Sequence, residues 1–439
     1  MKLETIKSII LITLIILSLL LTLGIWRYQP DYEYADSSRR VIEANLGGEE
    51  ETRKSVITPA QIIYHIEGSH LGLIDKSKER QLFEMMQGWA LYDFSSSTID
   101  LNENNFNRDD TVEVIFPTEI PTNIIEDLFT INEESYILSS SFNRMYIDLN
   151  DEITENQLIF HNTENGFTIS ANIQNMAEER EELLNYRFEN GFEFYVDYEN
   201  ATSDYIYLPE EVEMYKRPFS YQTIPITPLR NVLFTSPSAV RNSEYTDGSR
   251  LYTDGSRAMI VYDHHMEYTN PTPSETTPLE AKQLISQSLD FINAHGGWTT
   301  DVNDQYVLYK MNQRTNTVNF QLTYGGYPVF EEDELSTISV TMQNQSIYQY
   351  NRPLIQLKDT FGEGQQEKLE SGAEIVTILE RDKQYESKAI LDVKLGYKIE
   401  KQEDGQIFVL TPTWYIKDYS GWQELESDQE IPVSRGGEK

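Results

Sequence analysis

Histidine and acidic side chains are the residues of this chain that could support metal chemistry, and they form one recognisable cluster. The six histidines include two neighbours in the run Asp263-His264-His265, which has the composition of a metal site. We expect this run to lie in a β-strand, where adjacent side chains point to opposite faces. We therefore interpret both histidines as ordinary strand residues, and we predict no metal and no cofactor.

The search for a catalytic constellation is negative. The sequence contains no G-x-S-x-G, Walker loop, G-x-G-x-x-G after a predicted strand, or H-E-x-x-H. The 72 acidic residues supply so many carboxylate pairs that a glycosidase-like pair carries no information. Cysteine is absent, which excludes disulfides, thiolate nucleophiles, Cys-type zinc sites and a lipobox. We predict that the protein is not an enzyme.

A short repeat is the most conspicuous local feature. Tyr245–Arg250 and Tyr252–Arg257 both read YTDGSR. An Asp-Gly pair favours a tight turn with a positive φ at glycine, so we interpret both copies as turns. The alternative is that Asp254, Ser256 and Arg257 line a contact loop, because polar loop residues often bind partners.

Three tryptophans, Trp298, Trp414 and Trp422, allow two interpretations. Each could bind a glycan or a partner protein, but core packing is favoured because tryptophan buries a large area. The 35 basic residues leave a net charge of −37, which repels phosphate backbones. We therefore expect no nucleic acid among the partners.

An N-terminal helix is expected to anchor the rest of the chain in a membrane. Ser8–Trp26 is a run of 19 residues without a charge, close to the length that spans a bilayer core at about 1.5 Å per residue. We expect a single-pass anchor with a cytoplasmic N-terminus and an extracellular body, because a long C-terminal domain is translocated largely regardless of charge. A cleaved signal peptide is the alternative, but the apolar run exceeds the usual length.

The body is predicted to be α+β, with three extracytoplasmic domains and antiparallel sheets. We predict a cytoplasmic stub and anchor over 1–29, a stalk over 30–57, and domains over 58–205, 206–350 and 351–439. The last two domains share a plan of one helix followed by antiparallel strands. Four prolines within residues 209–230 mark this segment as a domain boundary or an irregular crossing.

Several predicted elements carry clear local signals. Gln61–Ile66 is predicted to be a strand. Asp75 is predicted to cap a helix that runs to Leu91. Thr277-Pro278-Leu279-Glu280 predicts a helix start, with threonine as the cap and proline in the first turn. Ser371-x-x-Glu374 predicts another helix start by the same logic.

Five segments, taken in their order along the chain, resemble the YycH family of regulatory proteins of Firmicutes. They are ETIKSIILITLIILSLLLTLGIWRYQPDYEY near the N-terminus, ITPAQIIYHIEG, LFTSPSAVRN followed by YTDGSR, FINAHGGW, and LTPTWYI. The second copy of YTDGSR departs from the pattern expected for this family. Because of this extra copy, the strand register of that hairpin is not predicted.

The resemblance implies a function that the residues alone do not supply. Members of the family are membrane-anchored accessory regulators of the sensor histidine kinase WalK (YycG), which controls cell-wall metabolism with its response regulator WalR (YycF). They act beside a second anchored protein, YycI, and no enzymatic activity is implied. The expected contact with the kinase is the transmembrane helix.

Small and polar residues are the positions of the span that we expect to contact a partner helix, because such residues mediate helix contacts in lipid. They are Ser8, Thr13, Ser18, Thr22 and Gly24. Two other classes of function stay open: a cell-wall ligand or cation binding protein, and a wall-associated hydrolase. The first would bind its ligand through the body alone, and the second would turn over wall material.

Overall fold

The computed structural model describes most of the chain. The described residues are 18, 44–98, 109–132, 137–150, 157–202, 204–271, 277–301, 303–331, 334–343, 345–381, 385, 389–402 and 407–425. The chain separates into two units, residues 1–43 and 44–439. In the first unit the one described residue, Ser18, is helical. The rest of the predicted anchor lies outside the described residues. Among the described residues, no helix has the length and apolarity needed to cross a membrane.

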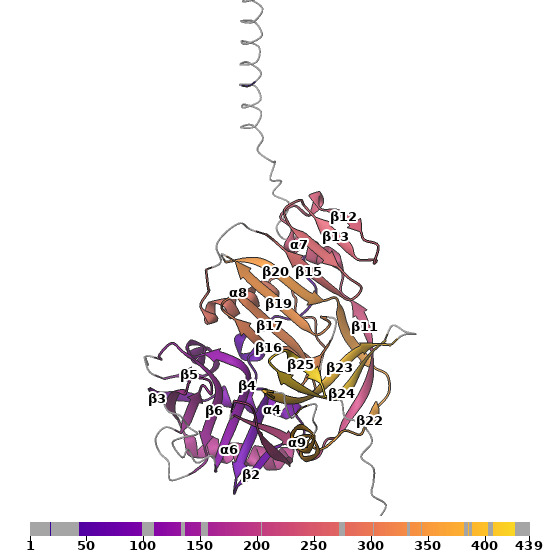
Figure 1. The fold of residues 1–439 in the computed structure, drawn as a ribbon. Coiled ribbons are helices and arrows are strands. Elements are labelled where there is room, and N and C mark those ends of the chain that lie inside the picture. The colour runs from indigo at the N-terminus through magenta and orange to yellow at the C-terminus, as the bar shows by residue number, and fades with distance from the viewer. Residues whose placement is uncertain are drawn as a thin grey trace, which may run out of the picture. The chain divides into compact units, whose positions relative to one another are not determined.

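The first sheet of the larger unit is formed by its N-terminal half (Figure 1). Its strands are β1 (Gln61–Ile66), β2 (Ser69–Leu73), β3 (Ala90–Thr98), β4 (Thr111–Pro121), β5 (Thr130–Ile131), β6 (Ser141–Asp148), β7 (Leu158–His161), β8 (Phe167–Ile173), β9 (Phe192–Glu199) and β10 (Tyr205–Pro209). They lie in the order β10-β9-β2-β1-β4-β6-β7-β8-β3-β5. The described pairs are antiparallel except β3 with β5.

The second sheet takes up the rest of the described chain. Its strands are β11 (Met214–Thr223), β12 (Arg241–Glu244), β13 (Arg250–Thr253), β14 (Ala258–Val261), β15 (His265–Thr269), β16 (Asp304–Asn312), β17 (Thr317–Tyr324), β18 (Tyr327–Phe330), β19 (Thr337–Gln343), β20 (Ser346–Pro353), β21 (Ile355–Thr360), β22 (Gln365–Glu367), β23 (Asp392–Lys401), β24 (Ile407–Asp418) and β25 (Gly421–Glu424). The main strand order is β12-β13-β14-β15-β20-β19-β17-β18-β23-β24-β11-β21. Outside this order, β16 pairs with β17, β22 pairs with β11, and β25 pairs with β24. Strands β18 and β23 are parallel.

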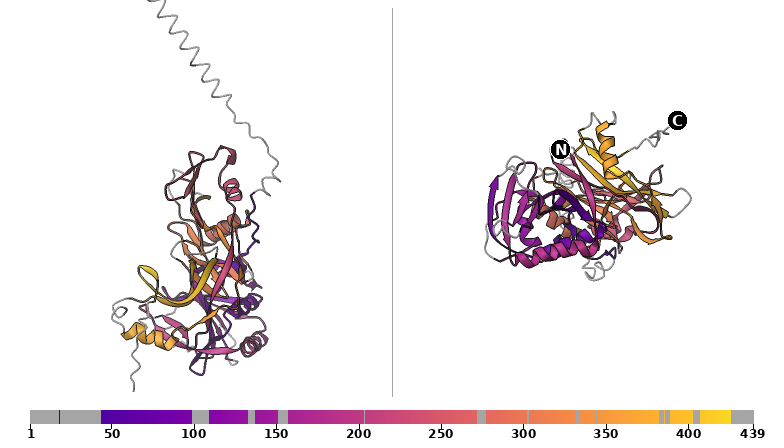
Figure 2. Two further views of the ribbon diagram at one scale, coloured as in Figure 1. Left: turned by 90° about the vertical axis from the view of Figure 1, so that its right-hand side faces the viewer. Right: turned by 90° about the horizontal axis from the view of Figure 1, so that it is seen from below.

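Helices cover these sheets (Figure 2). They are α3 (Arg53–Val56), α4 (Ser77–Met86), α5 (Ile125–Leu128), α6 (Met176–Asn190), α7 (Ile226–Leu233), α8 (Ala281–Asn293) and α9 (Gly372–Arg381), with short 3-10 turns η1 (Thr122–Ile124) and η2 (Pro237–Ala239). Helix α6 lies on the first sheet, where the Tyr64 hydroxyl of β1 donates a 3.0 Å hydrogen bond to the Leu183 carbonyl. Helix α8 buries Leu284, Ile285 and Ile292. This is the α+β class that the sequence predicts.

Two predicted helix starts have different outcomes. At α9 the Ser371 and Glu374 side chains cap each other's backbone amides, as predicted. At α8 the prediction is wrong, because the helix begins at Ala281 with Glu280 as its cap. The side chain of Asn316, from outside the helix, holds the preceding residues by accepting from the Leu279 amide and donating to the Thr277 carbonyl. A tertiary contact has replaced the local cap.

The end of one helix and the proline-rich segment also differ from expectation. Helix α4 ends at Met86 rather than Leu91, because β3 begins at Ala90. The segment predicted as an irregular crossing contains β11, which pairs with both β24 and β21. Pro218 lies inside β11, and the register shifts between Phe219 and Tyr221. Such an irregularity is one of the settings in which a strand tolerates proline.

Residues 44–57, which the sequence placed in a stalk, belong to the larger unit. They lie against the end of α8. The Leu46 amide donates to the His295 carbonyl at 2.8 Å, and the Gly48 amide donates to the Gly296 carbonyl at 2.9 Å. The FINAHGGW segment therefore holds residues 46–48 in place. A Cβ at Gly296 would overlap the Asn45 side chain, and a Cβ at Gly297 would overlap Ile292, which gives both glycines a structural reason.

Candidate functional site

A large cleft lies between the two sheets of the body. Its volume is about 1350 Å³, which exceeds the usual range of a small-molecule pocket. One wall comes from α4, β4, β6 and β10, and the other from β16, β17, β23 and β24. Distant parts of the sequence thus form one concave surface.

The charge of the cleft wall differs from that of the whole chain. Six basic side chains face seven acidic ones, whereas the chain has 35 basic and 72 acidic residues. The basic members are Lys76, Arg80, Arg144, Lys310, Lys394 and Lys417. A nearly balanced wall repels an anionic or polar ligand less than the rest of this acidic protein does.

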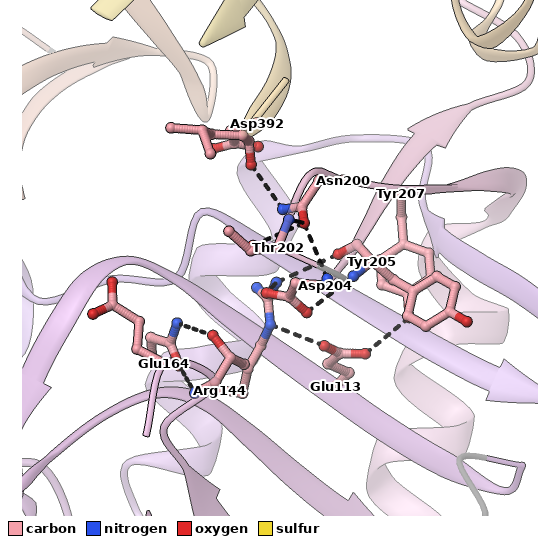
Figure 3. Close-up of polar contacts among 12 residues, drawn as sticks. Glu113, Arg144, Glu164, Asn200, Thr202, Asp204, Tyr205, Tyr207 and Asp392 are labelled. Carbon is pink, nitrogen blue, oxygen red and sulfur yellow. Dashed lines mark hydrogen bonds and ion pairs between the residues drawn. The ribbon is translucent and has the colours of Figure 1, made fainter. Parts of the chain in front are cut away.

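A buried polar network supports the first wall, and Glu113 on β4 is its centre (Figure 3). The Glu113 carboxylate accepts hydrogen bonds from the hydroxyls of Tyr146 at 3.2 Å and Tyr207 at 3.1 Å. His65 Nε2 lies 2.9 Å from the same carboxylate, and Arg144 Nε lies 3.2 Å from it. Glu113 is 1% exposed. An ionised carboxylate is stable at such a site only because these partners surround it.

The network continues from Arg144 toward the second sheet (Figure 3). Arg144 Nη2 donates to Asp204 at 2.7 Å, and the Asp204 amide donates to the Asn200 side chain at 3.0 Å. The Asn200 amide group in turn donates to the Leu391 carbonyl at 2.8 Å, just before β23. Burial acts to lower the pKa of Arg144, but Asp204 and Glu113 outweigh it, so the pKa is raised. The guanidinium therefore stays charged and couples the two walls.

Two cleft carboxyls have a raised pKa, which is a property that a general acid needs. Burial raises the pKa of Asp304 to about 6. Burial also raises the pKa of Glu79, against the effect of Lys76 at 2.9 Å. Both carboxylates already accept hydrogen bonds from the body, Asp304 from the Asp301 amide and Glu79 from the Ile62 amide. Their hydrogen bonds give them a structural role.

The predicted partner-binding residues of the span are not tested by the structure. Ser8, Thr13, Thr22 and Gly24 lie outside the described residues, and Ser18 is a helical, exposed residue. These positions stay a prediction.

The YTDGSR repeat forms two consecutive hairpins, β12–β13 and β13–β14. Gly248 and Gly255 have φ of +88° and +93°, as the interpretation of turns predicts. Asp254 accepts hydrogen bonds from the Ser256 and Arg257 amides. The extra copy therefore adds one strand, and the register pairs residue 241 with 253 and residue 253 with 258.

The proposed contact loop is only partly available to a partner. Ser256 is exposed, whereas Asp254 and Arg257 are half-buried. The Arg257 guanidinium binds the Thr235 hydroxyl and lies 3.4 Å from the Leu233 carbonyl. Arg257 thus fastens the hairpin to the end of α7, and its role as a contact residue stays a prediction.

Two of the three tryptophans are buried, and two of them line the cleft. Trp298 and Trp414 are each 2% exposed, which confirms core packing. Their indole nitrogens donate to the Asn293 side chain and to the Glu370 carbonyl. Trp422 is half-buried, and it lines the cleft together with Trp414.

The cleft and the Glu113 network were missed by the sequence reasoning. Glu113 alternates with Val112 and Val114, a pattern that favours a solvent-facing carboxylate on a half-buried strand, so no local signal indicated a buried charge. Its partners Arg144, Tyr146 and Tyr207 are distant in sequence and could not be identified from it.

Fold and site together define an α+β body of two joined sheets with a structurally supported cleft. The models of the YycH protein match this chain twice: the N-terminal domain over residues 4–186 and the C-terminal domain over residues 203–429. These matches cover most of the sequence. The chain belongs to the YycH family.

Known relatives agree with this assignment. The chain is 22% identical over 442 residues to the two-component system WalR/WalK regulatory protein YycH of Bacillus subtilis (strain 168), with 95% of each chain covered. The crystal structure of YycH from Bacillus subtilis superposes with a TM-score of 0.70 at 19% identity, covering 87% of this chain and 99% of that one. This likeness shows the fold. An uncharacterized protein from Eubacterium rectale gives a TM-score of only 0.34 at 9% identity, covering 50% of this chain and 86% of that one, and it adds nothing to the assignment.

Proposed function

We propose that this chain is an accessory regulator of a WalR/WalK-type two-component system. The observation that carries the proposal is the match along 95% of both chains to a protein named as a WalR/WalK regulator. The family models add support, because both halves of the chain are matched. The protein changes the output of the sensor kinase and does not itself catalyse a reaction.

The regulator is held in the membrane by Ser8–Trp26, with its N-terminus in the cytoplasm and its body outside. The body consists of three α+β domains, over 58–205, 206–350 and 351–439, of which the last two share a plan. Its partners are the WalK-like kinase and a YycI-like anchored protein. Regulation requires that the protein bind two kinase states with different affinity. The small and polar positions of the span provide the helix contact.

The test is a WalR-dependent reporter in the native host. Deleting the gene is expected to change the output at least twofold, and restoring the full chain is expected to reverse the change. Replacing Ser8–Trp26 with an unrelated helix of equal length is expected to abolish regulation at an unchanged membrane level of the protein. Unchanged output on deletion would refute the regulator. Regulation that survives the helix replacement would refute the transmembrane contact alone.

The cleft favours a second candidate function, a binding protein for a cell-wall ligand. Its volume of about 1350 Å³ and its nearly balanced wall are the specific observations. This function predicts saturable binding of wall fragments by the full chain, irrespective of which helix anchors it. A wall-associated hydrolase would instead release soluble fragments from purified wall, and conversion that persists in Asp304→Asn would exclude the Asp304 carboxyl as its acid.

A further inference from the structure

Three metal-binding side chains converge on the second sheet, outside the cleft. His265 and Glu267 lie on β15 (Figure 1), two residues apart and therefore on one face of the strand. Glu334 comes from the chain just before β19. One ring nitrogen of His265 and one oxygen of each carboxylate all lie within 4.8 Å of one another.

The neighbouring histidine does not take part, because His264 lies in the bend before β15 and packs against other residues. The His264 ring packs edge-on against Tyr221 at 5.7 Å and Phe408 at 5.2 Å. The expectation that the whole run lies in a strand is therefore wrong for Asp263 and His264, and only His265 belongs to β15. The sequence showed the Asp263-His264-His265 run, whereas the structure joins His265 to Glu267 instead.

The environment of the three groups is negatively charged and orders the imidazole. Tyr262 stacks on His265, with ring centroids 4.3 Å apart and planes 16° apart. Within the part of the chain that the structure describes, neither Glu267 nor Glu334 forms an ion pair with a lysine or arginine. The two carboxylates lie close together, and a cation between them would offset their mutual repulsion.

We propose that His265, Glu267 and Glu334 bind one divalent transition-metal ion of the Zn²⁺ class, with water completing its coordination. Zinc accepts imidazole and carboxylate ligands at about 2.0–2.2 Å. Imidazole disfavours Ca²⁺ and Mg²⁺, which prefer oxygen ligands alone. Half-burial of His265 and Glu267 with an exposed Glu334 leaves an entry path for the ion. This site is independent of the proposed kinase regulation.

The experiment is calorimetric titration of the full-length chain in a non-ionic detergent, without a histidine tag, using ZnCl₂ as the probe. One ion per chain is expected. His265→Ala and Glu267→Gln are each expected to weaken binding at least tenfold, since each removes one of three protein ligands. Glu334→Gln changes an exposed side chain with little risk to folding, and is expected to weaken binding as well.

The matched control is His264→Ala, the adjacent histidine that faces away. It is expected to change Zn²⁺ affinity less than twofold, with thermal melting of every variant confirming a folded protein. Equal loss of binding in His264→Ala and His265→Ala would overturn the proposal. So would binding that Glu334→Gln leaves unchanged, or a preference for CaCl₂ over ZnCl₂ that His265→Ala does not affect, which would indicate diffuse attraction to surface carboxylates.

Discussion

At the scale of single residues, Glu113 shows how one buried charge can organise a wall of the cleft. Four side chains converge on its carboxylate: His65, Arg144, Tyr146 and Tyr207. Arg144 depends on Glu113 in turn, because Arg144 is itself buried and needs an anionic partner. Removal of Glu113 would therefore leave the buried Arg144 guanidinium without one of its carboxylate partners.

We predict that Glu113→Ala lowers the free energy of unfolding by about 3 kcal/mol, because it leaves a buried guanidinium without one of its carboxylates. Urea denaturation of the full chain measures the change. Glu244→Ala, at an exposed position of β12, serves as the control and is expected to change stability by less than about 0.5 kcal/mol. Equal effects of the two variants would contradict the role assigned to Glu113.

Asp304 gives a prediction with a defined pH window. Its pKa in the folded protein is about 6, above the ordinary value of 3.8. The folded state therefore binds more protons than the unfolded state between these pH values, so the contribution of Asp304 to stability falls as pH rises from about 4 to 6. Asp304→Asn removes this titration. It is expected to exceed the parent in stability by about 3 kcal/mol at pH 8, with the difference vanishing near pH 4.

Denaturant unfolding at pH 4, 6 and 8 measures this difference. Asparagine retains an oxygen that can accept from the Asp301 amide, so the variant tests charge rather than the loss of the hydrogen bond. A difference between variant and parent that is constant across the three pH values would show that the Asp304 carboxyl does not carry the effect.

At the scale of elements, residues 44–51 and the end of α8 are held together by several hydrogen bonds. Asn293 binds this segment twice, by accepting from the Glu51 amide and donating to the Glu51 carbonyl. Gly48 approaches the backbone so closely that a Cβ there would overlap the Trp298 carbonyl. The segment that links the body to the predicted anchor is thus held by backbone contacts that need glycine.

We predict that Gly48→Ala releases residues 44–51 from the body, because its Cβ cannot fit without displacing the backbone. Hydrogen exchange of the segment is expected to speed up at least tenfold, while α6 keeps its protection. Glu50→Ala changes an exposed neighbour and is expected to leave exchange unaltered. Unchanged exchange in Gly48→Ala would show that the close approach does not hold the segment.

At the scale of the whole body, the two sheets are joined by ionic contacts as well as by packing. Asp127 of α5, on the first sheet, lies 3.2 Å from Arg53 Nη2 and 3.0 Å from Lys282 Nζ of α8, on the second. Its side chain is 19% exposed, so solvent screens the contact less than at an open surface. Asp127 therefore couples halves of the chain that are far apart in sequence.

We predict that the body unfolds in one calorimetric transition, and that Asp127→Ala lowers stability by about 1–3 kcal/mol by leaving two cations without their shared partner. Scanning calorimetry measures both. Glu84→Ala breaks an exposed pair with Arg80 and is expected to change the melting temperature by less than 2 °C. Two separate transitions in the parent protein would refute the coupling.

Sequence patterns correctly predicted elements that depend on residues close together in the chain. Gln61–Ile66 is a short run rich in β-branched residues, and the strand has those bounds. The capping box at Ser371 and Glu374 was predicted because both residues lie within one helical turn. The same logic failed at Thr277, where the distant Asn316 supplies a competing hydrogen bond. Prediction from sequence therefore succeeds where the stabilising hydrogen bond joins residues that are close together in the chain.

The sequence by itself determined the α+β class, the turns of the YTDGSR repeat, the absence of cysteine chemistry and the family resemblance. Each of these depends on composition, periodicity or residue order. Tertiary structure alone decided that β11 pairs with β24, that Asp204 reaches Arg144, and that Glu334 meets His265. These contacts join residues tens to hundreds of positions apart. Their pairing is selected by the packing of the whole body, and no local pattern records it.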